Sequence, residues 1–264
     1  MMAEQTPRGW STRWVGGVPV HPIELPRAAD VVIDLVRTGR AHRVHPCSAN
    51  DIAHSHRDKD YRTLLCEATL NLPDGMPLAL LSRERGARLT HRNRPRGTDV
   101  MRAVLAASQG DRLVSHYFFG GTDESLARLL SYVRTEFPGA TIAGHHAPEF
   151  ASVTEAFIES HVGQIQASEP SLVWVGLGAP KQAQFGALAS ARFPATYVMV
   201  GAAFDFLGGL RREAPRLWQR SGLEWLYRWR QEPQRLTRRY TIGAVQFVAA
   251  VAAERNAGAK GRRA

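Results

Sequence analysis

Four short segments of the sequence hold residue types that could bind or transform a phosphorylated ligand. Asp74 stands in Pro73-Asp74-Gly75, directly before an apolar stretch. Glycine-rich turns occur at Gly120-Gly121, Gly176-Leu177-Gly178 and Gly201-Ala202-Ala203. A glycine-rich turn that enters a helix offers backbone N–H groups and the positive end of the helix dipole, which suits phosphate. None of the three turns continues into a P-loop or a dinucleotide-binding pattern.

Asp74 has two interpretations. As a residue before a helix it can be an N-cap, which accepts hydrogen bonds from the first backbone N–H groups. As a carboxylate at the rim of a pocket it can instead be a general base that removes a proton from an acceptor hydroxyl. The residues alone leave both open. Each glycine pair taken singly indicates a tight turn, whereas three at one sheet edge favour a nucleotide-type pocket at Gly176, Gly178 and Gly201.

The sequence shows no spacing typical of a metal site. Asp58-Lys59-Asp60 has the form of the Asp-x-Asp clamp of many sugar-nucleotide transferases, but it lies in a polar helical stretch, which favours a solvated helix face. The ten histidines form no HExxH or Cys/His group, and two cysteines cannot supply a four-thiolate site. We therefore expect no metal and no cofactor.

Basic residues are concentrated near the C-terminus. The chain has a net charge of +10, and residues 211–264, with 13 basic and four acidic side chains, account for +9 of it. In this segment Trp, Leu and Arg alternate at helical spacing. Arg228, Arg235 and Arg238 would share one face of a continuous helix, although Pro233 can kink that helix or start a new one. Such a face could close over a pyrophosphate.

The arginine-rich segment allows three interpretations. Its arginines can be solvated helix faces, a nucleic-acid surface or a membrane-surface helix. No helix-turn-helix, zinc or RNA-recognition signature accompanies the charge, so we expect no nucleic acid. Trp and Leu on one face and Arg on the other fit an anionic membrane surface better.

The elements that must position these residues alternate regularly in the middle of the chain. We predict strands at 113–121 and 171–178, a strand with a loop at 140–150, and helices at 124–137, 154–168 and 180–193, and the segment 196–209 closes the series. Upstream, we predict a strand at 15–23 and helices at 27–38, 51–70, 76–86 and 98–109. Alternation at this spacing indicates an α/β fold, a Rossmann-like parallel sheet with helices on both faces, whose carboxyl edge is where such folds bind ligands.

We predict four regions along the chain. They are a disordered N-terminus at 1–14, an α/β core at 15–210, a helical Arg/Trp-rich appendage at 211–255 and a disordered tail at 256–264. The N-terminus lacks the apolar segment of a secretory signal, and the longest apolar stretch, 242–253, is too short to span a bilayer. These features predict a soluble, cytoplasmic protein.

The segments VWVGLGAPKQ, VGAAFDFLGG, RREAPRLWQRSGLEWLYRWRQEPQRLTRRY, PDGMPLAL and RPRGTDVM together resemble the WecG/TagA/CpsF glycosyltransferases. The resemblance covers roughly residues 15–250. It implies an inverting transferase that needs no Asp-x-Asp metal and moves N-acetylmannosamine or a related hexose from a UDP-sugar donor. The implied acceptor is a polyprenyl-diphosphate-linked sugar, and the products feed teichoic acid, enterobacterial common antigen or exopolysaccharide synthesis.

The resemblance also implies roles for individual residues. Asp74 matches the proposed catalytic base, which favours that interpretation over the N-cap, and Ser48 and Arg94 match further catalytic positions. Among binding residues, the resemblance implies Asn50 from a Thr-x-Asn motif, Gln182 and Asp205 from the donor pocket, and Arg228, Arg235 and Arg238 from the appendage.

The sequence departs from the family pattern at a few positions. Ser48 replaces threonine, Pro73 stands where small residues are usual, and the loop His145–Phe150 differs from the common glycine-containing form. These departures motivate an alternative, which is a non-catalytic nucleotide- or membrane-binding protein that keeps the fold. The leading expectation is an enzyme peripheral on the inner face of the plasma membrane. Whether an apolar face of the appendage pairs in a homo-oligomer stays open.

Overall fold

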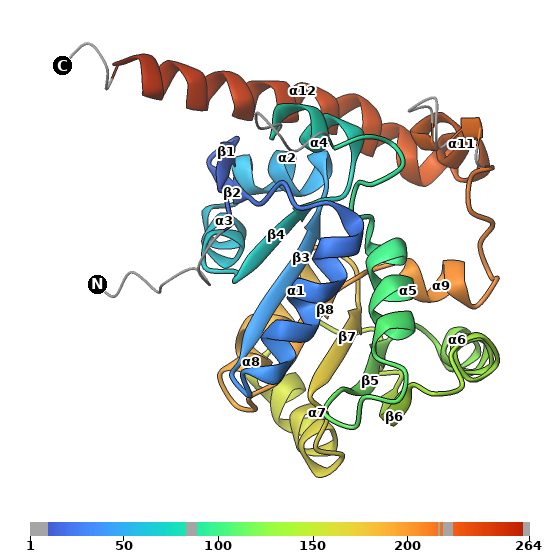
Figure 1. Ribbon diagram of the computed structural model, residues 1–264. Helices are drawn as coiled ribbons and strands as arrows, with labels where there is room; N and C mark the ends of the chain where they lie inside the picture. Colours follow the sequence, from blue (N-terminus) through green and yellow to red (C-terminus); the bar gives the residue numbers. More distant parts are fainter. Residues whose placement is uncertain (1–9, 83–88, 216, 219–223, 261–264) are drawn as a thin grey trace. The chain divides into compact units, whose positions relative to one another are not determined.

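The computed structural model describes residues 10–82, 89–215, 217–218 and 224–260 (Figure 1). The chain forms two compact units, each assembled from separated segments. Unit 1 comprises residues 1–24, 47–94 and 214–264, and unit 2 comprises residues 25–46 and 95–213. From residue 214 onward, the appendage therefore belongs to the same unit as Ser48, Asp74 and Arg94.

A six-stranded sheet has the order β4-β3-β8-β7-β5-β6. The strands are β3 (His42–Cys47), β4 (Leu70–Pro73), β5 (Ser115–Gly120), β6 (Thr141–His146), β7 (Leu172–Gly176) and β8 (Thr196–Met199). The neighbours β3/β8, β8/β7, β7/β5 and β5/β6 pair in parallel. The predicted α/β fold with a Rossmann-like parallel sheet is confirmed.

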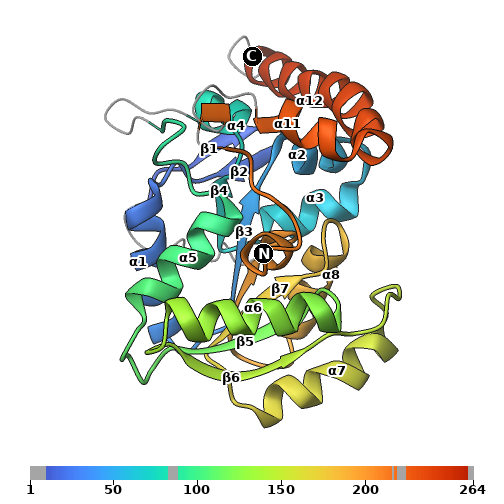
Figure 2. The same ribbon diagram turned by 90° about the vertical axis from the view of Figure 1, so that its right-hand side faces the viewer.

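Helices of unit 2 cover both faces of its strands. They are α1 (Leu25–Arg37), α5 (Gly97–Ala107), α6 (Asp123–Glu136), α7 (Glu155–Ala167), α8 (Lys181–Ser190) and α9 (Ala203–Leu207). Figure 2 shows α6 and α7 on opposite sides of the β5–β6 edge. Because both faces are covered, β7 is almost wholly apolar (LVWVG) and does not alternate with polar residues.

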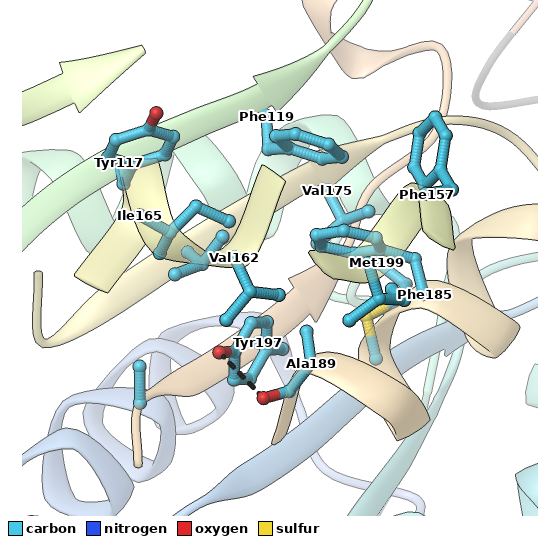
Figure 3. Close-up of a cluster of buried hydrophobic side chains, with 13 residues drawn as sticks. Tyr117, Phe119, Phe157, Val162, Ile165, Val175, Phe185, Ala189, Tyr197 and Met199 are labelled. Atoms are coloured by element: carbon cyan, nitrogen blue, oxygen red, sulfur yellow. Dashed lines mark hydrogen bonds between the residues drawn. The ribbon is translucent and has the colours of Figure 1, made fainter. Parts of the chain in front are cut away.

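A core cluster of unit 2 lies between the strands and helices α7 and α8 (Figure 3). Phe119 of β5 stacks on Phe185 of α8, with ring centroids 4.2 Å apart. Tyr197 of β8 is fully buried, and its hydroxyl donates to the carbonyl of Phe193 at 3.1 Å. Aromatic packing of this kind anchors α8, whose N-terminal end follows the glycine turn at Gly176-Leu177-Gly178.

A buried histidine lies on the opposite face of the sheet. The His116 side chain accepts a hydrogen bond at Nδ1 from Trp174 Nε1 at 3.1 Å, and its Nε2 lies 2.9 Å from Ser108 Oγ. Because Nδ1 is the acceptor, the proton of the neutral ring is on Nε2, which donates to Ser108. Burial lowers the pKa of His116 to about 4, so the ring is neutral.

Unit 1 contains a hairpin and two sets of helices. Strands β1 (Arg13–Val15) and β2 (Val18–Val20) pair antiparallel around Gly16-Gly17, and α2 (Ala49–Arg57), α3 (Lys59–Cys66) and α4 (Met76–Leu81) follow along the chain. The appendage supplies α11 (Glu224–Gln231) and α12 (Pro233–Lys260), and α12 runs along α2 (Figure 1). A Cβ on Gly16 would lie 2.4 Å from Ile52 of α2 and 3.0 Å from Ala250 of α12, so the hairpin turn, α2 and α12 meet at this glycine.

Several element predictions need correction. The predicted strand 15–23 covers the last residue of β1, the turn and strand β2. The two glycines of the turn, at positive φ, reverse the chain there. The predicted helix 51–70 is two helices, separated at Asp58, which ends α2 and caps α3 by accepting from the Tyr61 N–H at 2.9 Å. Strands β3 and β4 were not predicted. The closing segment 196–209 consists of β8 followed by α9.

The predictions for the chain ends and for Pro233 meet the structure only in part. Pro233 is the first residue of α12, which confirms that it starts a new helix. Residues 256–260, predicted to be disordered, belong to α12. Of the predicted disordered N-terminus, residues 1–9 lie outside the described part of the chain, and Arg13 and Trp14 belong to β1.

Candidate functional site

Three glycine turns follow neighbouring strands at the carboxyl edge of unit 2. Gly120 ends β5 and pairs in register with Gly176, which ends β7, while Gly201 follows β8. Packing explains two of these glycines. A Cβ on Gly120 would lie 2.6 Å from the Gly176 carbonyl carbon, and a Cβ on Gly176 would lie 2.8 Å from the Phe204 ring. Glycine is thus required at positions 120 and 176 because neighbouring atoms leave no room for a Cβ. This requirement is independent of any ligand.

Gly178 and Gly201 require glycine for a different reason. Both adopt positive φ, +74° and +54° respectively, and a Cβ on Gly178 would meet nothing within 4 Å. Gln182, in the first turn of α8, lies beside Gly201, and its Nε2 donates to the Met199 carbonyl at 3.4 Å. Its Oε1 is buried and has no hydrogen-bond partner among the described residues. A buried acceptor without a partner at this edge can serve a ligand donor.

Asp205 lies on α9 at the same edge, and its carboxylate has two partners within unit 2. Asp205 Oδ1 accepts from Ser125 Oγ at 3.1 Å, and Oδ2 lies 2.9 Å from Arg211 Nε. The structure therefore ties Asp205 to the start of α6 and to the segment after α9. Both carboxylate oxygens of Asp205 therefore have protein partners. Asp205 stays a predicted donor-pocket residue because of its position at this edge of the sheet.

Asp74 is half-buried in unit 1, between the end of β4 and the start of α4. Its backbone N–H donates to the Cys47 carbonyl at 2.9 Å, which fixes the turn against β3. The N-cap residue of α4 is Gly75, which has no side chain to cap the helix. The N-cap interpretation of Asp74 is therefore wrong, since the helix begins one residue later.

Ser48 lies at the start of α2 and is held by Asp51. Asp51 Oδ2 accepts from the Ser48 N–H at 2.8 Å and from Ser48 Oγ at 2.6 Å. Its other oxygen, Oδ1, accepts from the Tyr61 hydroxyl at 2.7 Å. Because the Ser48 hydroxyl gives its proton to Asp51, its oxygen faces any ligand as an acceptor.

Asn50 lies two residues after Ser48, in the first turn of α2. Its Oδ1 would be 3.8 Å from a Cβ on Gly243, so it faces α12. The predicted residues Ser48 and Asn50 therefore lie at the N-terminal end of α2, the helix on which α12 of the appendage packs.

The Cys47 thiol reports the electrostatics around Ser48 and Asp74. It is fully buried, and burial raises its pKa well above the usual value, with the negative charges of Asp51 and Asp74 raising it further. Both carboxylates therefore act on the same thiol, and Cys47 stays protonated. The second cysteine, Cys66, is exposed.

Arg94 connects Asp74 to the appendage. Its side chain is only 4% exposed, its Nε donates to the Asp74 carbonyl at 3.0 Å, and its Nη2 donates to Glu224 Oε2 at 2.6 Å. The third nitrogen, Nη1, is buried and has no hydrogen-bond partner among the described residues. A buried guanidinium with one nitrogen uncommitted is suited to an anionic ligand.

The predicted appendage arginines are placed only by their backbone. Arg228 lies in α11, and Arg235 and Arg238 lie in α12. Their side chains are outside the described part of the structure, so the predicted shared face stays a prediction. The break between α11 and α12 at Glu232 means that the first of the three is on a separate helix from the other two.

The predicted site residues fall into two groups. Unit 1 holds Ser48, Asn50, Asp74 and Arg94, and unit 2 holds Gly176, Gly178, Gln182, Gly201 and Asp205. The sequence analysis did not identify three residues that lie around the first group: Asp51, Tyr61 and Glu224. The Ser-x-x-Asp spacing of a capping box could have indicated Asp51, but no local pattern signals Glu224, which is 130 residues from Arg94.

The arrangement of side chains and the composition of the helices bear on metal binding and on membrane insertion. Across the described ranges, no group of three or more His, Cys, Asp or Glu side chains is arranged to hold a metal ion. Among helices in the same ranges, none is both long enough and apolar enough to cross a bilayer.

The chain is similar to known glycosyltransferases over most of its length. The model of the glycosyl transferase WecG/TagA/CpsF family matches residues 13–261. A protein of Bacillus spizizenii (strain ATCC 23059 / NRRL B-14472 / W23), named N-acetylglucosaminyldiphosphoundecaprenol N-acetyl-beta-D-mannosaminyltransferase, is 32% identical over 202 residues, which cover 76% of this chain and 74% of the relative. A protein of Bacillus subtilis (strain 168) with the same name is 28% identical over 190 residues, 70% of each chain.

Proposed function

Because the chain belongs to the WecG/TagA/CpsF family of glycosyltransferases, we propose that it transfers a hexose of the N-acetylmannosamine type from a UDP-sugar to a polyprenyl-diphosphate-linked sugar. The names of both relatives specify N-acetylmannosamine as the sugar and N-acetylglucosaminyldiphosphoundecaprenol as the acceptor, which supports this substrate pair. One structural observation carries the proposal. The half-buried Asp74 turn is bonded to Arg94, a buried arginine with one nitrogen uncommitted.

The proposed reaction is a single displacement at the anomeric carbon. An acceptor hydroxyl oxygen forms a bond to that carbon while the bond from the carbon to the diphosphate oxygen breaks. Asp74 takes the hydroxyl proton, and UDP leaves with the bonding electron pair. Attack from the side opposite the leaving group inverts the anomeric centre. Ser48, whose proton is engaged by Asp51, would accept a hydrogen bond from a substrate hydroxyl.

The departing UDP must be stabilised as negative charge develops on it. We assign this role to Arg94 Nη1 and to Arg228, Arg235 and Arg238 of the appendage, in place of a divalent cation. We propose Gly178, Gly201 and Gln182, which lie together at one sheet edge of unit 2, as donor-binding residues. One preorganised donor to a developing negative charge is worth about 3–4 kcal/mol of barrier. Because arginines take the place of a divalent cation in this proposal, transfer activity should persist in EDTA.

We propose that the lipid of the acceptor brings the enzyme to a membrane surface, on the cytoplasmic face. Exposed apolar side chains on unit 1 support this. Leu80 is 47% exposed on α4, and Val245 and Val248 are 70% and 65% exposed on α12. Between these two helices an apolar groove is lined by Leu81, Phe247, Val248, Val251 and Ala252, with Arg255 and Asn256 at its polar side. An apolar helix face beside arginine suits an interface of acyl chains and anionic headgroups.

The experiment that tests the function is transfer onto a synthetic prenyl-diphosphate N-acetylglucosamine acceptor. A panel of UDP-hexoses is screened first for binding by thermal shift and then for transfer, with and without EDTA. We expect transfer from UDP-N-acetylmannosamine and equal rates under both conditions. UDP binding without transfer from any donor would contradict the proposal and support the non-catalytic alternative. Transfer abolished by EDTA would contradict metal independence alone.

A further inference from the structure

Glu224 connects the appendage to the predicted catalytic turn through a single arginine. Glu224 is the first residue of α11, and its side chain is 13% exposed. Its Oε2 lies 2.6 Å from Arg94 Nη2, and Arg94 Nε donates to the Asp74 carbonyl at 3.0 Å. All three residues belong to unit 1. The contact therefore runs from the appendage to the backbone of the proposed base.

A guanidinium group has a rigid planar fork, so two of its nitrogens fix the direction of the third. In Arg94, Nε is committed to the Asp74 carbonyl and Nη2 to Glu224, and these two bonds determine where Nη1 lies. Nη1 is buried and lacks a hydrogen-bond partner among the described residues. Without Glu224, one bond would remain, and the fork could rotate about it.

We propose that Glu224 is a positioning residue that orients Arg94 and the Asp74 turn once α11 is in place. The inference rests on the proposed function and adds a dependence to it. The turn that carries the base and the arginine that faces the leaving group are both aligned by a carboxylate of the appendage. Docking of the appendage thereby becomes a condition for the chemical step.

The proposal predicts a specific kinetic pattern for Glu224→Gln. The amide keeps the shape of the side chain but loses the negative charge that holds the guanidinium. We expect kcat to fall about 10- to 100-fold, the loss typical of a catalytic group displaced by about 1 Å. The KM for the UDP-sugar should change less than threefold, because the predicted donor residues Gly178, Gln182 and Gly201 are on unit 2.

A double-mutant cycle with Arg94→Lys separates positioning from simple stabilisation. Lysine keeps the charge of Arg94 but has no fork, so the path from Glu224 to Asp74 is cut. In that background, Glu224→Gln should lower kcat by less than about twofold, since interacting residues give non-additive effects. Glu136→Gln, the same chemical change at an exposed glutamate of α6, is the matched control and should leave kcat at the wild-type value.

The possible outcomes distinguish this inference from the proposed function. Wild-type kcat in Glu224→Gln, or an equal loss with and without the Arg94→Lys substitution, would overturn the inference while leaving the enzyme intact. No transfer by the wild type would overturn the proposed function and the inference with it. The melting temperature is recorded for every variant, because removing one partner of a buried pair is destabilising. If Glu224→Gln does not fold, Glu224→Asp replaces it in the cycle, because aspartate keeps the charge on a shorter side chain. Its loss of kcat should likewise be smaller in the Arg94→Lys background than in the wild type.

Discussion

A one-residue offset at α4 determines how the Asp74 carboxylate is used. Gly75 is the N-cap residue, and the Asp74 backbone is fixed on both sides, by the Cys47 carbonyl and by Arg94. The residues around Asp74 name it as a candidate but do not by themselves separate cap from base, and only the family resemblance favours the base. Both roles place an aspartate beside the first turn of an apolar helix, and only the position at which the helix begins separates them.

The first residue-scale prediction concerns the proposed base. We expect Asp74→Asn to lower kcat by about 100- to 10,000-fold, because the amide cannot take the acceptor's proton. Binding of UDP, measured by isothermal titration calorimetry, should stay within a few fold of wild type. Asp60→Asn, at an exposed position of α3, is the control and should have no effect. Turnover by Asp74→Asn near the wild-type rate would remove Asp74 from the mechanism.

The second residue-scale prediction concerns the glycine edge. Gly176→Ala should destabilise the protein by about 1–3 kcal/mol, because its Cβ would lie 2.8 Å from the Phe204 ring. Gly163→Ala, within α7, meets nothing within 4 Å and should stabilise by about 0.5–1 kcal/mol. Urea denaturation measures both. Equal stability of the two variants would show that Phe204 shifts without cost.

At the scale of elements, apolar patterns identified the strands that are buried on both faces. The runs in β5, β7 and β8 are long and apolar enough to predict strands, and their regular alternation with helices predicted the parallel sheet. Strand β3, with the sequence HRVHPC, was missed because polar residues interrupt its pattern, and β4 is only four residues long. Both are held by pairing with neighbours from other parts of the chain, which local patterns do not record.

The exposed face of α12 carries the element-scale prediction. We expect the double substitution Val245→Gln and Val248→Gln to weaken binding to vesicles of anionic phospholipid at least about tenfold, since each valine loses apolar burial worth roughly 1.5 kcal/mol. Leu113→Gln, at a 69% exposed leucine of unit 2, is the control. Sedimentation with vesicles measures binding, and thermal denaturation should show unchanged stability. Undiminished sedimentation of the double variant would place the membrane contact elsewhere.

At the scale of the whole molecule, the division into units was beyond sequence reasoning. Unit 1 is assembled from three separated segments, and its central ion pair joins Arg94 to Glu224 across 130 residues. The change of composition near residue 210 predicted an appendage, and the last segment of unit 1 begins at Ala214. It could not indicate that α12 packs on α2, because helix pairing depends on complementary surfaces in three dimensions.

The stability of the molecule should depend on pH through His116. Burial lowers its pKa to about 4, whereas an unfolded histidine has a pKa near 6.5. The unfolded state therefore binds more protons between these values, and stability that is complete above pH 6.5 is lost as the pH falls toward 4. We expect His116 to contribute a loss of about 2–3 kcal/mol between pH 7 and pH 4.5.

Urea denaturation across this pH range, with His116→Gln as the comparison, measures the contribution of that single ring. The variant should be less stable at pH 7, because Trp174 and Ser108 lose their partner. Its free energy of unfolding should nevertheless fall less steeply with pH than that of the wild type. Parallel pH dependence in the two proteins would show that other groups control acid stability.

The packing of α12 on α2 has a consequence for synthesis on the ribosome. The two helices meet at Gly16, yet the ribosome makes α2 long before α12. At 5–20 residues per second, roughly 10–40 s pass between them. During that interval the nascent chain carries α2 without α12, the helix that packs on it in the folded protein. Translation speed and chaperone access over this window should therefore influence the yield of active protein.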